Sequence, residues 1–232
     1  MKYYISILSI LLVLVSCSNN ENTMTLTGQV KGLKKGTLLL QKIENFTLVT
    51  IDSIVINGEE IFNLTSIVAS PEIYYLHVKI SDGTLLDDRI AFFAEPKEIS
   101  IQTNLNNFNT KAIIIGSENQ NLLNDYNQLM KRYSAKNLEL IEQDFNGKKD
   151  GNDSLVNDAQ QKQRNILSNR YLATVNFAFG HSDFEIAPYL MVHQVNNINK
   201  KYLDTVYNKI TPKIKDSKYG KALESLIKSR EN

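Results

Sequence analysis

The spacing of the hydrophobic residues changes once along the chain, at Gly116. From Met24 to this glycine, apolar and polar residues alternate in short runs, a pattern typical of half-buried strands. After it, apolar residues recur every three or four positions in long runs, which is typical of amphipathic helices. The sequence therefore predicts an α+β protein, with a β-rich domain at residues 24–116 and an all-helical domain at residues 117–232.

Turn signals divide the β-rich part into eight short extended runs. The clearest is "NGEE" at Asn57–Glu60, because Asn-Gly accepts positive φ at both central positions of a hairpin turn. Strands spaced about ten residues apart predict an antiparallel β-sandwich or open barrel. The expected strands are Met24–Val30, Thr37–Glu44, Thr47–Ile56, Glu60–Val68, Glu72–Ile80, Asp88–Ala94, Glu98–Thr103 and Lys111–Ile115.

The helical part begins with a capping signal, Ser117 followed three residues later by Gln120. An apolar stripe then continues at helical spacing until the polar segment "NGKKDGND" at 146–153, which we interpret as a loop. Pro188 suits the first turn of a later helix, where its missing N–H costs nothing. The further helices are expected at Ser154–Phe179, from Ala187 onward, at Lys200–Ile210 and at Ser217–Ser229.

The first residues have the features of an export signal. Lys2 precedes an apolar run from Ile5 to Val15, which is too short to span a bilayer but suits a secretory signal peptide. "LVSC" at Leu14–Cys17 resembles the bacterial lipobox, in which the cysteine is lipidated and becomes the first mature residue. We predict a signal peptide over residues 1–16, lipid attachment at Cys17 and a lipidated tether over residues 17–23. The alternative is that Cys17, the single cysteine of the chain, is incidental to an ordinary signal peptide.

The location and charge of the mature chain limit its partners. Removing Lys2 lowers Lys+Arg from 26 to 25, against 25 Asp+Glu, so the formal charge becomes zero. Neutrality argues against a nucleic-acid partner, which calls for a basic surface. We expect a cell-envelope protein that contacts the membrane through its lipid and has an envelope protein as partner. Ser18 carries no acidic retention signal, which favours the outer membrane; the periplasmic and surface faces both stay open.

Four segments carry a resemblance to a known family: "LTGQVKGLKKGTLLLQ", "NGEEIFNLTSIVASPEIYYLHV", "IAFFAEPKEISI" and "IIGSENQNLLNDYNQLM". They resemble the domain of unknown function 4369, which lies at the N-terminus of envelope lipoproteins, usually ahead of a thioredoxin-like (AhpC/TSA-type) domain. The resemblance implies the fold and the envelope location better than it implies a chemistry. This chain contains no Cys-x-x-Cys pair, so we expect no thiol–disulfide exchange by it alone.

The residues that commonly perform chemistry are sparse. His77, His181 and His193 lack metal-ligand spacing. We expect His77 to be a packed or solvent-edge strand residue, His181 a helix-end residue and His193 a partly buried helix residue. We expect no catalytic residue, no cofactor and no metal site. Three Asp-Ser/Thr-aliphatic triplets resemble an O-glycosylation signal of some bacterial envelopes; the modified residues would be Ser53, Ser154 and Thr205, with Ser154 in a loop.

These observations favour a non-catalytic envelope lipoprotein with a binding or assembly role. One alternative is the orphaned N-terminal part of a thiol–disulfide oxidoreductase lipoprotein whose thioredoxin-like domain is lost or encoded separately. Another is a binder of an envelope glycan or small ligand, since Tyr side chains can stack on sugars.

Overall fold

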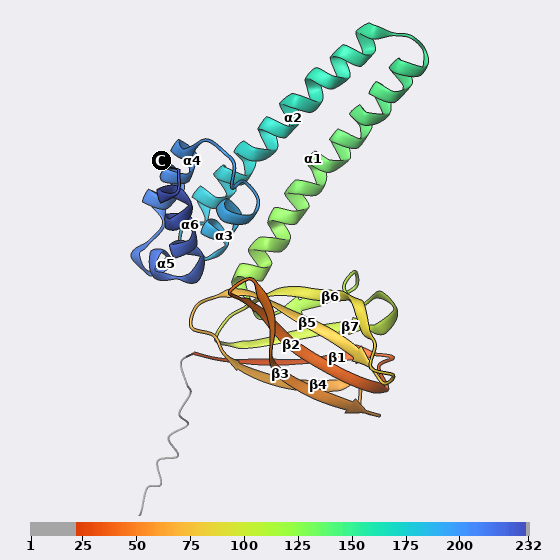
Figure 1. The fold of residues 1–232 in the computed structure, drawn as a ribbon, viewed down its shortest axis with the longest axis vertical. Helices are drawn as coiled ribbons and strands as arrows, with labels where there is room; N and C mark the ends of the chain where they lie inside the picture. The colour runs from red at the N-terminus through yellow and green to blue at the C-terminus, as the bar shows by residue number, and fades with distance from the viewer. Residues whose placement is uncertain (1–21, 231–232) are drawn as a thin grey trace, which may run out of the picture.

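The structure, a computed structural model, describes residues 22–230 and contains a β-sandwich followed by helices (Figure 1). One sheet has the strand order β4-β1-β7-β8 and the other β3-β2-β5-β6. The predicted α+β class and the order of its two parts are confirmed. The strands are β1 (Thr23–Lys31), β2 (Lys35–Glu44), β3 (Thr47–Asn57), β4 (Ile61–Ile67), β5 (Glu72–Ile80), β6 (Leu85–Ala94), β7 (Glu98–Asn104) and β8 (Ile113–Ile115).

The strand arrangement differs from the expected one in two ways. Asn57–Glu60 does not close a hairpin, because β3 pairs with β2 whereas β4 pairs with β1 in the other sheet, and one strand pair is not antiparallel. β1 and β7 run parallel, with Thr25 opposite Glu98 and Lys31 opposite Asn104, whereas the other ladders are antiparallel. Alternating burial shows which side chains face the core, but it carries no information about the direction of a partner strand. The chain visits the second sheet before returning to form β7, and it returns in the direction of β1.

The sandwich core follows from the alternation within each strand. In β4, for example, Phe62, Leu64 and Ser66 are buried while their neighbours are exposed. Tyr74 and Phe92 both lie in this core, and their rings meet edge to face with centroids 6.4 Å apart.

Gly116, where the hydrophobic spacing changes, has a structural reason to be glycine. Its φ is +108°, and a Cβ placed there would lie 2.2 Å from the carbonyl oxygen of Glu98. The chain can leave β8 and enter the first helix at this close approach only without a side chain.

Two long helices, α1 (Glu118–Lys149) and α2 (Asp153–Gly180), form a hairpin that projects from the sandwich (Figure 1). The Ser117 hydroxyl accepts a hydrogen bond from the Gln120 N–H at 3.0 Å, so the predicted cap is present. The predicted loop over 146–153 is shorter than expected, because α1 continues to Lys149. Gly147 there allows close packing against Val156, which lies 3.0 Å from where a Cβ would stand.

The remaining helices pack beside the C-terminal part of α2 (Figure 1). They are α3 (Ile186–His193), α4 (Lys200–Lys209), α5 (Pro212–Asp216) and α6 (Lys218–Lys228). Their shared core includes Met191, Leu203, Val206 and Leu223. The short α5 was not predicted, because Thr211-Pro212 reads only as a break. None of the helices within residues 22–230 is long and apolar enough to cross a membrane.

A third apolar cluster joins the sandwich to the helices. Phe93 of β6 packs with Tyr126 of α1, Ile186 and Leu190 of α3, and Tyr219 of α6. The Tyr219 hydroxyl also accepts a hydrogen bond from the Ile73 N–H at 3.0 Å. The helices are therefore held against one end of the sandwich by both apolar and polar contacts.

Candidate functional site

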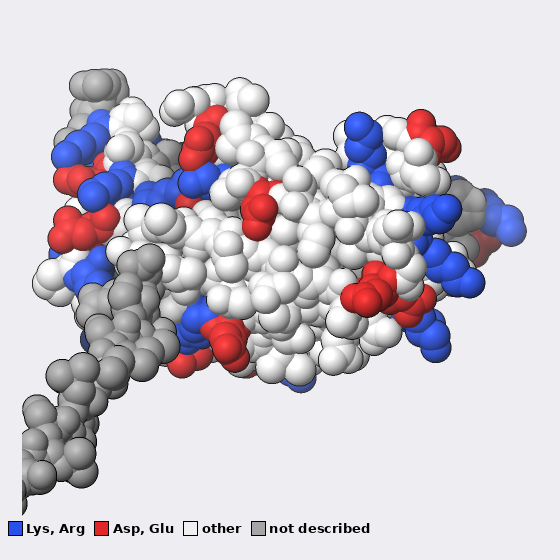
Figure 2. All heavy atoms as spheres, turned by 90° about the horizontal axis from the view of Figure 1, so that it is seen from below, with Lys and Arg blue, Asp and Glu red and all other residues white. Residues whose placement is uncertain are grey.

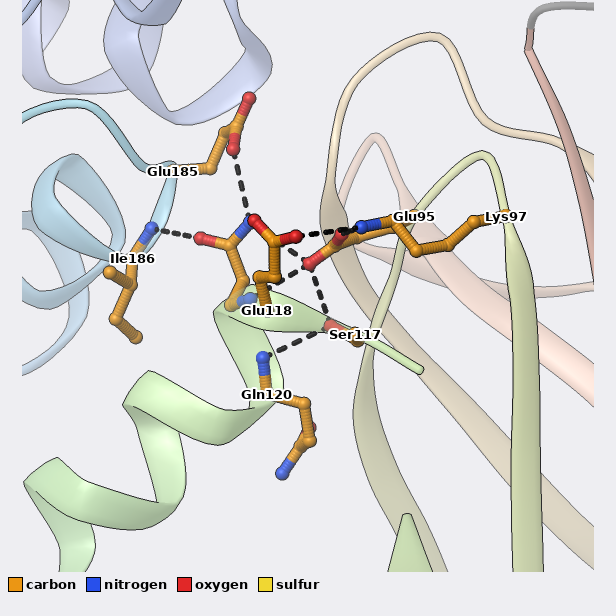
Figure 3. Close-up of polar contacts among 8 residues, drawn as sticks. Glu95, Lys97, Ser117, Glu118, Gln120, Glu185 and Ile186 are labelled. Carbon is orange, nitrogen blue, oxygen red and sulfur yellow. Dashed lines mark hydrogen bonds and ion pairs between the residues drawn. The ribbon is translucent and has the colours of Figure 1, made fainter. Parts of the chain in front are cut away.

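The most concentrated polar cluster surrounds the Glu95 carboxylate, directly after β6 (Figure 3). Its Oε1 accepts hydrogen bonds from the Ser117 hydroxyl (2.7 Å), the Asn119 backbone N–H (2.8 Å) and the Asn119 side-chain amide (3.1 Å). Its Oε2 forms an ion pair with Lys97 at 3.0 Å. Glu95 thus supplies a negative charge at the N-terminus of α1, where the helix dipole favours it.

Asn119 extends this cluster to α3. Its Nδ2 also donates to Glu185 Oε2 at 3.1 Å, and its Oδ1 accepts from the Ile186 N–H at 2.8 Å. One buried amide therefore connects the turn after β6, the start of α1 and the start of α3. We call Glu95, Lys97, Ser117, Asn119 and Glu185 the junction cluster.

The two glutamates of the junction cluster differ in protonation behaviour. Burial would raise the pKa of Glu95, but the hydrogen bonds from Ser117, Asn119 and Lys97 outweigh it and hold the pKa below its usual value. Burial raises the pKa of Glu185, and the nearby Glu95 charge adds to this, against smaller opposing contributions from its hydrogen bonds and Lys213. Such divergence is found at acid–base catalytic sites and also in structural networks.

The geometry favours the structural explanation. A cleft of about 510 Å³ adjoins the cluster, but both oxygens of Glu95 are already occupied by donors from the chain itself. A general base needs a free lone pair within reach of a substrate proton. The junction cluster can therefore fix the helices to the sandwich, and the Glu95 carboxylate is committed to this structural role.

A second concavity lies between α1 and α2, far along the hairpin. It has a volume of about 830 Å³, and we call it the hairpin groove. Its apolar residues are open to solvent: Leu138 is 67% exposed, Ile141 48% and Leu167 49%. The groove is lined by Tyr133, Ser134, Asn137, Leu138, Ile141, Asp144, Lys148, Gln160, Gln163, Arg164, Ile166, Leu167 and Arg170.

Exposed apolar residues on the sandwich are arranged differently. Ile61 of β4 and Ile113 of β8 lie at opposite edges of one sheet, separated by Gln29 and Gln102 in the same row. Figure 2, which views the molecule from below the sandwich, shows acidic and basic side chains mixed toward the two ends and few between them. The hairpin groove gathers its apolar residues, whereas this sheet disperses them.

The predicted modification sites have different places in the structure. Cys17, the signal peptide 1–16 and residues 17–21 of the tether lie outside the described residues. Ser53 is exposed on β3, and Thr205 is exposed on α4, where its hydroxyl donates to the Lys201 carbonyl. Ser154 is exposed as expected but lies in the first turn of α2 and not in a loop, because α2 begins at Asp153.

The histidines stand apart from one another. His77 is buried on β5 and contacts the Gln41 side chain and the Leu86 carbonyl. His181 follows the end of α2, and its Nδ1 contacts the Phe177 carbonyl at 2.8 Å. His193 ends α3 and is more exposed than expected, although its ring packs 4.8 Å from that of Tyr189. Among the side chains that the structure describes, no three of His, Cys, Asp or Glu gather as a metal site would require.

Sequence reasoning missed both the hairpin groove and the junction cluster. A signal for the groove was present, since Leu138 and Ile141 lie three residues apart beside the stripe that packs α1 on α2. No local signal indicated that Glu95, Asn119 and Glu185 would meet, because this depends on tertiary structure.

Residues 24–123 match the family described as Domain of unknown function (DUF4369). The matched segment covers the sandwich and the first residues of α1. No curated protein matches the chain.

Proposed function

We propose that this chain, in which residues 24–123 form a DUF4369 domain, is a lipid-anchored cell-envelope protein with a non-catalytic role in binding or assembly. The observation that carries the binding role is the hairpin groove, an open concavity with exposed Leu138 and Ile141 on a projecting pair of helices. Apolar concavities of this kind commonly bind other molecules. The polar residues of the junction cluster, by contrast, are engaged with one another.

The anchoring part rests on the lipobox resemblance around Cys17. Asn22, where the described chain begins, follows Cys17 by five residues, and this segment can reach at most roughly 17 Å when extended. Lipidation would therefore keep the sandwich close to the bilayer, with the outer membrane as the favoured location. The attached acyl chains, with palmitate among them, would supply the membrane affinity.

Anchoring is tested by Cys17→Ala in cells fed radiolabelled palmitate. We expect the wild-type protein to be labelled and to sediment with outer membranes, and the variant to lose both properties. A matched control is Ser18→Ala, which leaves the thiol in place. Membrane attachment and labelling that persist in the Cys17→Ala protein would refute the anchor.

The binding role is tested separately with a photo-crosslinking amino acid at Leu138 in whole cells. We expect a discrete cross-linked product from this position and none from Asn165, an exposed residue of α2 that does not line the groove. Positions Val55 and Ile113 probe the exposed sandwich faces. The binding role fails if none of these positions forms a product.

A further inference from the structure

We propose that the hairpin groove binds an amphipathic α-helix of a partner protein that carries acidic residues beside its apolar stripe. This inference rests on the proposed binding role and specifies its surface and the chemistry of its partner. A third helix laid along α1 and α2 would bury the exposed Leu138, Ile141 and Leu167 side chains. Recognition of an apolar helix face by a groove between helices is a common mode of binding.

The dimensions of the groove suit a helix. Its α1 lining runs from Tyr133 to Lys148, which corresponds to roughly 22 Å of helix axis at 1.5 Å per residue. This length accommodates about four turns of a partner helix. Because Leu138 and Ile141 stay substantially exposed, the groove is open along its length and admits a long ligand.

Helices α3–α6 already cover the C-terminal part of an apolar stripe on α2. Tyr171, Val175 and Ala178 pack into the core that α2 shares with α3–α6. Leu167 lies one turn before Tyr171 on the same face of α2 but is left exposed. The groove is therefore the uncovered continuation of an established helix–helix interface, and a further helix is the element that would continue it.

Charge indicates the kind of helix. Arg164 and Arg170 line the groove and are exposed, and no ion pair of either residue occurs within residues 22–230. Arg164 donates a hydrogen bond to Gln161, while the groove's one acidic residue, Asp144, is engaged by Lys148 and Gln160. The free positive charge calls for carboxylates on the partner. It also disfavours a second copy of this chain, whose groove would present the same arginines.

The test uses the mature lipidated chain in phosphatidylcholine nanodiscs and two fluorescent helical peptides of about 20 residues, long enough for four turns with frayed ends. Both peptides carry the same Leu stripe; one is flanked by Glu and the other by Lys. Fluorescence anisotropy, corrected with empty nanodiscs, measures binding. We expect the Glu peptide to bind and the Lys peptide to bind at least about tenfold more weakly.

Variants assign the binding to the groove. R164E/R170E should weaken the Glu peptide about tenfold and strengthen the Lys peptide, whereas R132E/K149E, with the same change in charge outside the groove, should leave both unchanged. L138S/I141S should weaken both peptides. Circular dichroism and unfolding curves show whether each variant is folded, which is expected because the replaced side chains are exposed.

Three results would overturn the inference. They are no binding of the Glu peptide, binding of the Glu peptide by R164E/R170E as tight as by the wild type, or a dimer in sedimentation that L138S/I141S dissociates. The last would make a second copy the occupant. Cross-links in cells from Val55 or Ile113 but not from Leu138 would remove the groove and leave the broader binding role standing.

Discussion

At the scale of single residues, Asn119 connects the two halves of the molecule through hydrogen bonds. Its amide donates to Glu95 and Glu185, and its oxygen accepts from the Ile186 N–H. Because a buried polar group without a partner is costly, the hydrogen bonds of this amide favour one relative position of the three segments that it contacts. The two glutamates it contacts should nevertheless respond differently to substitution.

We expect Glu95→Gln to lower the free energy of unfolding by about 2 kcal/mol at pH 7, because the neutral amide loses charge-assisted hydrogen bonds and directs an N–H at donors. The folded-state pKa of Glu95 is lowered, so its stabilisation is complete above the unfolded-state pKa of about 4.3 and is lost as the pH falls through the folded value. The deficit of the variant, measured by urea unfolding from pH 7 to pH 3, should shrink below about pH 4.

Glu185→Gln is the matched control, with the opposite dependence on pH. The folded-state pKa of Glu185 is raised, so the stabilisation from its protonated form is present below the unfolded-state pKa and is lost as the pH rises through the folded value. The side-chain oxygen of the substituted glutamine would still accept from Asn119 without a charge. We expect this variant to be as stable as wild type or more stable at pH 7, and to lose any advantage near pH 4. A marked loss at pH 7 would contradict the assignment.

Phe46 has a backbone conformation that is unfavourable for a bulky residue. It forms the two-residue turn between β2 and β3 with Asn45, has φ +63° and is fully exposed. A left-handed conformation costs a bulky residue about 1–2 kcal/mol, part of which Gly would recover. Phe46→Gly should therefore raise the free energy of unfolding by about 0.5–1 kcal/mol in urea titrations. Phe46→Ala, which keeps the Cβ, is the control and should show less gain.

At the scale of elements, the spacing of hydrophobic residues predicted most strands and helices but not the contacts between them. The Ser117 cap was predicted because Ser117 and Gln120 are near in sequence. The parallel pairing of β1 with β7 and the bond from Tyr219 to Ile73 join residues far apart in sequence, and no period encodes them. Residues 1–21, which include Cys17, lie outside the described structure, so the anchor is still a prediction.

The contact between α6 and β5 can be tested at one atom. The Ile73 N–H lies where the pairing of β2 with β5 has ended, and the Tyr219 hydroxyl is its acceptor. Tyr219→Phe keeps the ring packing against Phe93 but leaves this N–H unpaired, so we expect a loss of about 1–3 kcal/mol in thermal or urea unfolding. Tyr202→Phe, on α4, is the control and should change stability by less than about 0.5 kcal/mol. Equal effects would argue against the hydrogen bond.

At the scale of the whole molecule, we expect two units of different stability. The third apolar cluster should make the sandwich, α3–α6 and the adjoining half of the hairpin one cooperative unit, whereas the far half of the hairpin should unfold more easily. Phe93, Tyr126 and Tyr219 join both parts near the base, whereas beyond Tyr133 the hairpin helices are packed against each other alone and expose Leu138, Ile141 and Leu167. Segments with few buried apolar contacts open more readily than the core that supports them.

Hydrogen exchange followed by mass spectrometry measures this difference. Amides of α1 beyond Tyr133, with those of the facing half of α2, should exchange at least about tenfold faster than amides between Glu118 and Met130. Peptides from β1 serve as the slow reference. The Glu-flanked peptide should slow exchange in the far hairpin and leave β1 unchanged, because a third helix would bury the groove's apolar residues. If the amides exchanged equally slowly along the whole hairpin in the free protein, its far half would be stable without a partner. That result would argue against a partner helix that stabilises the far half by covering the groove.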